Sequence, residues 1–191
     1  MRDEQALVEA LRQRDTDALS TVFETYSDRI YRLALSLLLD EQQADGVVQD
    51  TFISLIEHID SFEGRAALGT WLYRVAYNNC MGRLRRIKPQ LDLDDSEDAS
   101  LPEKLMDWNA IPDKLMASAE SIEQISRAVE GLNPALRVVF LLRDVEELST
   151  IETAEVLGLK PGTVKVRLHR ARLALREQLA DYFEERVEHG M

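Results

Sequence analysis

The sequence predicts an all-α protein of two small helical domains joined by an acidic linker. Apolar residues recur at three- and four-residue steps through both halves of the chain, which is the spacing that lines one face of a helix. Neither the alternation of apolar and polar residues nor the hairpin turns typical of strands are found. The composition changes at Pro89, and residues 90–118 carry eight acidic and two basic side chains, half of the net charge of −12. We therefore expect domains at residues 1–89 and 119–191 and a linker at 90–118.

The overall composition is that of a globular protein that buries a core. The chain has 191 residues, of which 45% are hydrophobic and 30% are charged. Its single cysteine, Cys80, excludes both a disulfide and a thiolate zinc cluster within one chain. The longest nearly unbroken apolar stretch, Leu33 to Leu39, falls far short of the roughly 20 residues that cross a bilayer. No secretory segment opens the sequence. We expect a cytoplasmic protein with no membrane insertion of its own.

Three helices are expected in the N-terminal half. The first spans about residues 17–39, and the second begins after Asp40, whose carboxylate can cap it. A loop around Gly64 follows at residues 61–68, and the third helix spans about residues 70–86. The apolar face of the second helix is predicted to consist of Val47, Val48, Phe52, Ile53, Leu55, Ile56 and Ile59.

The C-terminal half contains the pattern of a helix-turn-helix. Two apolar stripes come first, one ending near Asn133 and the next reaching Val145. Ser149 and Glu152 then form the capping box S-x-x-E of a short helix that ends at Leu157 and Gly158. After a tight turn, Thr163 can cap a longer helix that runs toward the C-terminus. A short helix, a turn with glycine and a second helix form this motif.

The charge on the second helix of the motif indicates its role. Six basic residues and no acidic residue lie between Lys160 and Arg176. At about 100° per residue, Val164, Leu168, Ala171 and Leu175 share one face and are predicted to face the core. The residues predicted to point outward near the helix start are Lys165, Val166, His169 and Arg170, with Arg167 and Arg172 at the flanks. A recognition helix enters a major groove in this way. The structural alternative is a basic helix end that complements its own dipole, but the basic run starts at the wrong end of the helix for that purpose.

A second basic cluster closes the N-terminal half. It consists of Arg83, Arg85, Arg86 and Lys88, and cations at the end of a helix also have a purely structural explanation. Aromatic and polar residues precede it, which is the mixture that holds unstacked single-stranded bases over a basic track. These residues are Phe62, Trp71, Tyr73, Arg74, Tyr77, Asn78 and Asn79. Trp71 also fits a place in the core.

Together the two halves resemble a bacterial RNA polymerase sigma factor of the extracytoplasmic function (ECF) type, in the sigma-70 superfamily. The matching stretches are YSDRIYRLALSLL, QADGVVQDTF, TWLYRVAYN with the following RLRR, and VVFLLRDVEELS joined to GTVKVRLHRARLAL. The resemblance implies sigma region 2 in residues 1–89, for polymerase docking and for recognition and melting of the minus-ten element. It implies sigma region 4 in residues 119–191, for recognition of the minus-thirty-five element. Core RNA polymerase, promoter DNA and an anti-sigma factor are the implied partners.

The resemblance also implies roles for three groups of residues. The residues assigned to docking on the polymerase are Asp45, Gln49 and Asp50. Two groups of residues are assigned to recognition of the minus-ten element. The first is the loop that would capture a flipped-out base: Phe62, Glu63, Gly64, Arg65, Ala66 and Ala67. The second consists of Tyr77, Asn78, Arg83, Arg85 and Arg86. The residues assigned to recognition of the minus-thirty-five element are Lys165, Val166, Arg167, His169, Arg170 and Arg172. Gly46 departs from the family pattern, because an acidic residue is common there and glycine inside a helix costs about 1 kcal/mol relative to alanine.

Other classes of function explain the sequence less well. The three histidines, at positions 58, 169 and 189, form no metal-ligand or catalytic-triad pattern, and no glycine-rich phosphate loop is present. We therefore expect no enzymatic activity, catalytic residue, cofactor or metal. A sigma-like adaptor that sequesters an anti-sigma factor without binding DNA would suit the acidic chain, but not its two basic clusters. A stand-alone helix-turn-helix regulator leaves the N-terminal half unexplained.

Overall fold

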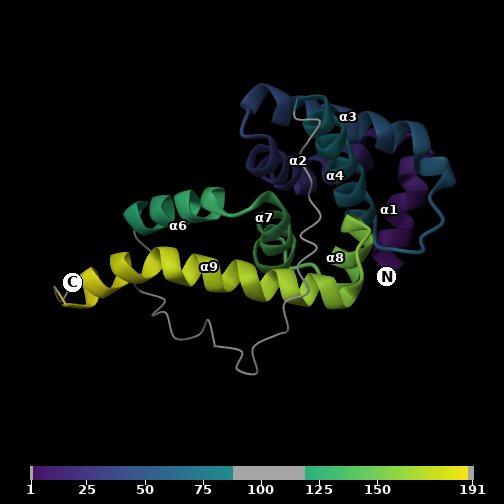
Figure 1. Cartoon of the computed structure of the whole chain (residues 1–191). Coiled ribbons are helices and arrows are strands. Elements are labelled where there is room, and N and C mark those ends of the chain that lie inside the picture. The colour runs from purple at the N-terminus through teal and green to yellow at the C-terminus, as the bar shows by residue number, and fades with distance from the viewer. Residues whose placement is uncertain (1, 88–118, 189–191) are drawn as a thin grey trace.

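The computed structural model describes residues 2–87 and 119–188, with side chains for residues 4–86 and 123–179 (Figure 1). These two ranges, called the N-terminal and C-terminal halves below, contain helices and no strand, which confirms the predicted fold class. The predicted linker at 90–118 lies outside the described residues. The N-terminal helices are α1 (Arg2–Arg12), α2 (Thr16–Leu38), α3 (Glu41–His58), a 3₁₀ turn (Ile59–Ser61) and α4 (Leu68–Ile87). The C-terminal helices are α6 (Ala119–Gly131), α7 (Pro134–Phe140), a π-helical turn (Leu141–Val145), α8 (Thr150–Leu157) and α9 (Pro161–Glu188).

Short polar residues begin the long helices of the N-terminal half. The carboxylate of Asp15 accepts hydrogen bonds from the backbone N–H groups of Asp17 and Ala18, at 2.9 and 2.8 Å. Asp40 accepts one from Gln43 N–H at 2.8 Å, so its predicted role as a cap is confirmed. These bonds satisfy N–H groups that have no partner within their own helix. Both helix starts are therefore encoded locally.

Helix α1 is an element that the sequence analysis did not predict. Val8 and Leu11 are buried against the rest of the N-terminal half, and Leu7 is partly buried beside them. Their spacing of one and three residues is that of one helix face, so the periodicity was present in the sequence. The stripe is short and is surrounded by charged residues, so it gives only a weak helix signal.

The helix-turn-helix is built from local contacts as predicted. Ser149 Oγ accepts the Glu152 N–H at 3.2 Å, and the Glu152 carboxylate accepts the Ser149 N–H at 2.7 Å. Hydrogen bonds to the Glu152 carboxylate from the side chain and the backbone of Ser149 lower the pKa of Glu152. Gly158 ends α8 with a φ of 66°, a left-handed conformation that glycine adopts without strain. The prediction that Thr163 caps the next helix is wrong: α9 begins at Pro161, because proline is well suited to the first helical position.

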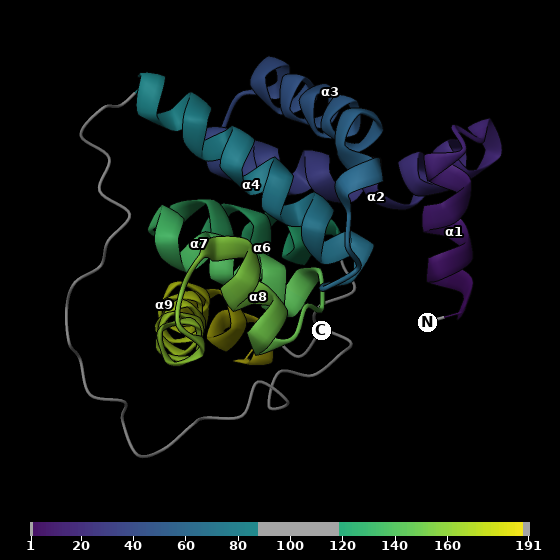
Figure 2. The ribbon, with the colours of Figure 1, turned by 90° about the vertical axis from the view of Figure 1, so that its right-hand side faces the viewer.

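One apolar core runs through both halves. Helix α4 packs against α3 and α2 on one side and against α8 on the other, and Figure 2 shows α8 lying beneath α4. Leu72, Ala76 and Cys80 of α4 belong to the same buried cluster as Val156 and Leu157 of α8. Burial raises the pKa of the Cys80 thiol to about 12, so the thiol stays protonated. The N-terminal and C-terminal halves are therefore packed together rather than held apart.

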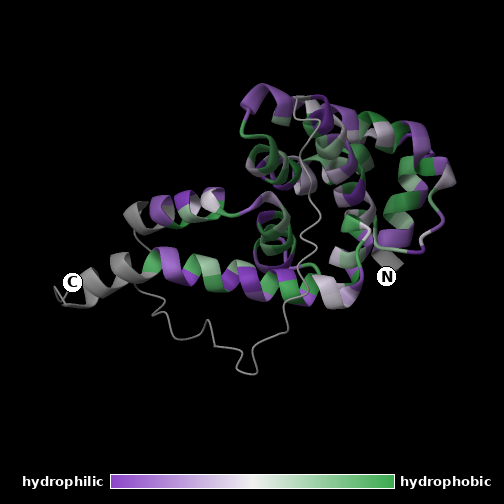
Figure 3. Ribbon diagram, in the orientation of Figure 1, coloured by the Kyte–Doolittle hydropathy of each residue, from purple (hydrophilic) through white to green (hydrophobic). Residues whose placement is uncertain are grey.

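Helix α9 lies along the C-terminal half and carries hydrophobic and hydrophilic residues in alternation within each turn (Figure 3). Its apolar residues pack against α6, α7 and α8. A second, smaller buried cluster joins α6 to α9 and consists of Ala128, Leu132, Ala171, Leu175 and Leu179. Among the described residues, no helix has both the length and the apolar character needed to span a membrane.

Candidate nucleic-acid interface

The start of α9 is the first part of the candidate interface. Val164, Leu168, Ala171 and Leu175 are buried, which confirms the predicted core face. On the other face Lys165 is exposed to solvent, while Val166, His169 and Arg170 are half-buried. Lys165 alone among these four is as open as the periodicity predicted. The open face at the start of α9 is therefore narrower than the periodicity predicts.

Arg167 and Arg172 do not lie on open flanks of the helix as predicted. Arg167 is only 6% exposed and lies close enough to Tyr77 of α4 to act on its phenol. Arg172 makes two hydrogen bonds to the Asp144 carboxylate, at 2.8 and 2.7 Å. The helical periodicity predicts only which residues of α9 face the core of the C-terminal half. It does not predict the approach of Arg167 to Tyr77 of α4 or the pairing of Arg172 with Asp144 in the π-helical turn. In this arrangement both guanidinium groups have contacts within the protein.

The loop of residues 62–67 lies between the 3₁₀ turn and α4. Phe62 is buried, with its ring centroid 6.0 Å from that of Trp71 in an edge-to-face arrangement. The ring of Phe62, which the resemblance assigns to the base-capturing loop, is therefore covered in this arrangement. Glu63, Gly64, Arg65 and Ala67 are exposed, and Ala66 is half-buried. Arg65 and Glu63 form an ion pair at 2.5 Å within the loop.

Helix α1 braces this loop from outside. Arg12 donates a 2.6 Å hydrogen bond to the Phe62 carbonyl, and Arg14 pairs with Asp60 at 2.7 Å. Glu4 accepts the backbone N–H of Leu68 at 2.5 Å, at the start of α4, where a carboxylate is favoured by the helix dipole. No local sequence pattern marks these residues, because their partners are 46 to 64 positions away. They hold the two ends of the loop while its centre stays exposed.

The last turns of α4 carry the remaining residues of the predicted minus-ten group. Asn78, Arg85 and Arg86 are exposed, and Tyr77 is half-buried. Burial raises the pKa of Tyr77, while the nearby charges of Arg167 and Arg85 act in the opposite direction. The structure thus brings one residue of the predicted minus-ten group next to one residue of the predicted minus-thirty-five group.

Arg83 faces α3 instead of joining Arg85 and Arg86. Its guanidinium donates to the Gln43 side chain at 2.7 Å and to the Asp50 carboxylate at 2.6 Å. It occupies the space beside Gly46, where an added Cβ would lie 2.8 Å from Arg83 Nη2. The glycine that looked unfavourable in the helix therefore makes room for a bridge between α4 and α3. One of the predicted polymerase contacts, Asp50, is the acceptor of this bridge.

Replacing Gly46 by alanine is expected to stabilise the protein by less than the about 1 kcal/mol that alanine gains over glycine in a helix. The new methyl group would displace the Arg83 guanidinium from Gln43 and Asp50. In an Arg83→Ala background the same replacement should give the full gain. Urea unfolding of the four proteins measures the difference as a coupling energy. Equal gains in both backgrounds would contradict this account of Gly46.

Helix α3 presents an exposed surface that is both acidic and apolar. Asp45, Gln49 and Asp50 are all exposed. Ile53 and Ile56, which were predicted to be buried, are 53% and 43% exposed. The buried face of α3 is narrower than predicted and uses Ala44, Val47, Thr51, Phe52 and Leu55. The exposed surface of α3 therefore carries two apolar side chains beside the carboxylates of Asp45 and Asp50.

Both halves of the chain are similar to known proteins. The chain matches the family models for sigma-70 region 2 over residues 22–89 and for sigma-70 region 4 over residues 122–175. It is 34% identical to the ECF RNA polymerase sigma factor SigW of Bacillus subtilis, over 91% of this chain and 95% of that protein. It is 32% identical to the ECF RNA polymerase sigma-E factor of Escherichia coli K12, over 90% of this chain and 92% of that protein.

Two solved structures share the fold. One is CnrH in complex with the cytosolic domain of CnrY, with a TM-score of 0.66 and 22% identity, covering 93% of this chain and 97% of that one. The other is the sigma factor RpoE of Bartonella quintana in complex with the anti-sigma factor NepR, with a TM-score of 0.64 and 23% identity, covering 84% and 96%. The family matches and the sequence identities lead to one conclusion: this chain belongs to the ECF sigma factors of the sigma-70 family.

Proposed function

We propose that this protein is an alternative sigma factor that binds core RNA polymerase and directs it to promoters with two recognition elements. The observation that carries this proposal is the stretch from Lys160 to Arg176, which holds six basic residues and no acidic one in a chain of net charge −12. This stretch forms the start of α9, the second helix of the helix-turn-helix. Positive charge at the start of the second helix of a helix-turn-helix favours binding to the phosphate backbone of DNA.

The minus-thirty-five element is assigned to the start of α9. Lys165 and Arg170 would supply the charge, and Val166 would meet the methyl group of a thymine, since apolar side chains read thymine in the major groove. His169 belongs to the same group, and Arg167 and Arg172 would join it once Arg167 leaves Tyr77 and Arg172 leaves Asp144. The first turns of a recognition helix are the part that reaches base edges.

The minus-ten element is assigned to the loop at 62–67 together with Tyr77, Asn78, Arg85 and Arg86. A base taken out of the stack costs a few kcal/mol, which a pocket and phosphate contacts can offset. The exposed centre of the loop and its braced ends support this role, because a rigid frame lowers the entropy lost on capturing a base. Arg83 is assigned to the same group, and would have to leave Asp50 in order to reach DNA.

The exposed surface of α3 is assigned to polymerase docking. Asp45, Gln49 and Asp50 provide polar contacts, and Ile53 and Ile56 extend the surface with apolar area. A mixed surface of this kind suits a protein partner with basic side chains. We further propose that residues 1–89 and 119–191 are the functional domains, that residues 90–118 link them, and that an anti-sigma factor binds the protein. The relative from Bartonella quintana forms a complex of that kind. The protein would act in the cytoplasm and would catalyse no reaction of its own.

Run-off transcription with purified core polymerase on a library of genomic promoters tests the proposal. We expect transcripts that start at a small set of sites, and that are absent when core polymerase is used alone. The promoters recovered would share two short sequence elements. Tight association with core polymerase but no initiation would favour the adaptor that sequesters an anti-sigma factor without binding DNA.

A further inference from the structure

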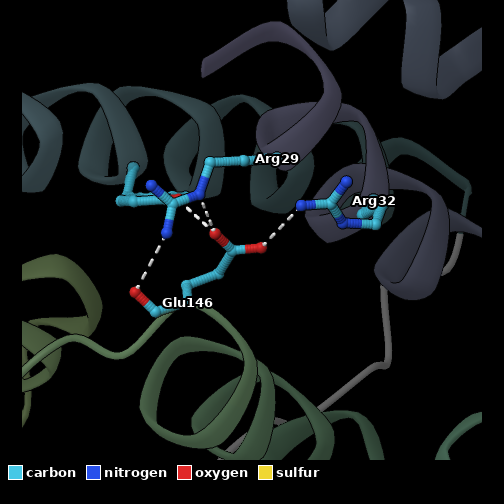
Figure 4. Close-up of polar contacts among 4 residues, drawn as sticks. Arg29, Arg32 and Glu146 are labelled. Atoms are coloured by element: carbon cyan, nitrogen blue, oxygen red, sulfur yellow. Dashed lines mark hydrogen bonds and ion pairs between the residues drawn. The ribbon is translucent and has the colours of Figure 1, made fainter. Parts of the chain in front are cut away.

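A buried carboxylate lies where the two halves of the protein meet. Glu146 follows the π-helical turn, and its side chain is only 3% exposed. Its carboxylate accepts hydrogen bonds from Arg29 Nε at 2.6 Å and from the Tyr73 hydroxyl at 2.5 Å (Figure 4). Arg32 approaches the other carboxylate oxygen at 3.5 Å, and Arg29 also donates to the Glu146 carbonyl at 3.3 Å. We call these four residues the Glu146 cluster.

Every donor to Glu146 in this cluster comes from the other half of the protein. Arg29 and Arg32 are on α2 and Tyr73 is on α4, whereas Glu146 belongs to the C-terminal half. Burial and the neighbouring carboxylate raise the pKa of Tyr73, so its hydroxyl remains a donor. A buried carboxylate that loses its partners costs far more than an exposed ion pair. The contact is therefore favourable only while the two halves stay together in this register.

The packed arrangement covers parts of both surfaces assigned to DNA. Helix α8 of the helix-turn-helix packs directly on α4, which carries the minus-ten residues. Arg167 is buried beside α4, and Tyr77 is half-buried. A side chain in such contacts is not available to a phosphate or a base.

Promoter geometry also requires the two halves to separate. Elements centred near minus ten and minus thirty-five lie about 25 base pairs apart, which is about 85 Å along B-form DNA. Helices α4 and α8, which are in contact, cannot reach both elements at once. The 29 residues at 90–118 would span at most about 100 Å when fully extended, so the chain between the halves is long enough for the open form.

We propose that the Glu146 cluster is a latch that holds the free protein in a closed, self-masked state, and that release of this latch precedes promoter binding. This inference rests on the proposed function for its biological purpose. Closed and open forms would be in equilibrium, and core polymerase would favour the open form by binding it more tightly. Weakening the cluster should shift the free protein toward the open form before any partner is added.

The first test is small-angle X-ray scattering of the full-length protein in its wild-type form and as Glu146→Gln. A compact chain of this length has a radius of gyration of about 16 Å, and the open form must be larger. We expect the radius to rise by several ångströms in Glu146→Gln, because its neutral amide no longer offsets the charges of Arg29 and Arg32. The matched control is Glu147→Gln, which makes the same chemical change at the exposed neighbouring position and should scatter like the wild type.

A second variant approaches the latch from the other half. Arg29→Gln removes the charged donor that makes two hydrogen bonds to Glu146 without touching the helix-turn-helix, and it should open the protein as Glu146→Gln does. Combining the two changes should add little, because both break one interaction. Circular dichroism establishes that each variant keeps its helices. If both variants stay as compact as the wild type, the latch does not exist, and the proposed function is unaffected.

Duplex binding gives a second readout. With a 30-base-pair duplex of mixed sequence at low ionic strength, Glu146→Gln should bind about tenfold more tightly than Glu147→Gln, because opening frees Arg167 and removes α4 from beside the start of α9. Equal affinities would refute the masking of DNA-binding residues. If the variants open but wild-type protein with core polymerase starts no transcription, the proposed function fails and the latch has no promoter-binding surface to mask.

Discussion

Replacing Arg170 by alanine is expected to weaken promoter binding by the complex with core polymerase by about 5- to 150-fold, the 1–3 kcal/mol of one good contact to a base edge. Lys165→Ala should weaken binding less selectively and should lower the salt dependence, by about 0.9 in the logarithmic slope if Lys165 neutralises one phosphate. Lys165 is exposed and Arg170 is half-buried in the first turns of α9, where the early residues of a recognition helix meet the groove.

The measurement is fluorescence anisotropy of a labelled promoter fragment, recovered from run-off transcription, titrated at several salt concentrations. The matched control is Arg127→Ala, which removes one positive charge from the exposed face of α6 in the same half of the protein. We expect the control to bind like the wild type. If Arg170→Ala and Lys165→Ala also bind like the wild type, α9 does not read DNA and the adaptor becomes the better explanation.

Replacing Arg137 by methionine is expected to destabilise the protein by about 3 kcal/mol, the largest effect on stability that we expect from one substitution. Arg137 is only 4% exposed, and burial lowers its pKa. Its guanidinium donates to the carbonyls of Glu130, Leu132 and Ser36. The carbonyls of Glu130 and Leu132 lie at the C-terminal end of α6, and that of Ser36 lies on α2 in the other half of the protein.

Methionine keeps much of the volume of Arg137 but leaves these carbonyls without their donor. Removing a buried charge recovers some desolvation energy, but each unsatisfied buried acceptor costs about 1–3 kcal/mol, so the net effect is a loss. Urea unfolding measures it, and Arg127→Met should change stability by less than about 0.5 kcal/mol because its ion pair is exposed. A loss in Arg137→Met as small as in the control would mean that these hydrogen bonds contribute little.

The local structure of this protein is well predicted from its sequence. Asp40, Ser149, Glu152 and Gly158 cap helices through contacts that span at most four residues, so their neighbours in the chain are enough to define them. The helix-turn-helix and the core face of α9 follow in the same way from spacing. Polar groups with partners far along the chain leave no such pattern. The bridge from Arg83 to Asp50 and the brace from Arg12 to the loop at 62–67 are examples.

Residue order alone determined the helices after α1, the caps at Asp40 and at Ser149 with Glu152, and the family to which the chain belongs. Only the tertiary structure decided that Arg167 is covered, that Gly46 makes room for Arg83 and that Glu146 joins the two halves. The physical reason is the range of the interactions. A helix and its caps are set by hydrogen bonds between near neighbours, whereas the burial of a charge depends on which distant surface packs against it.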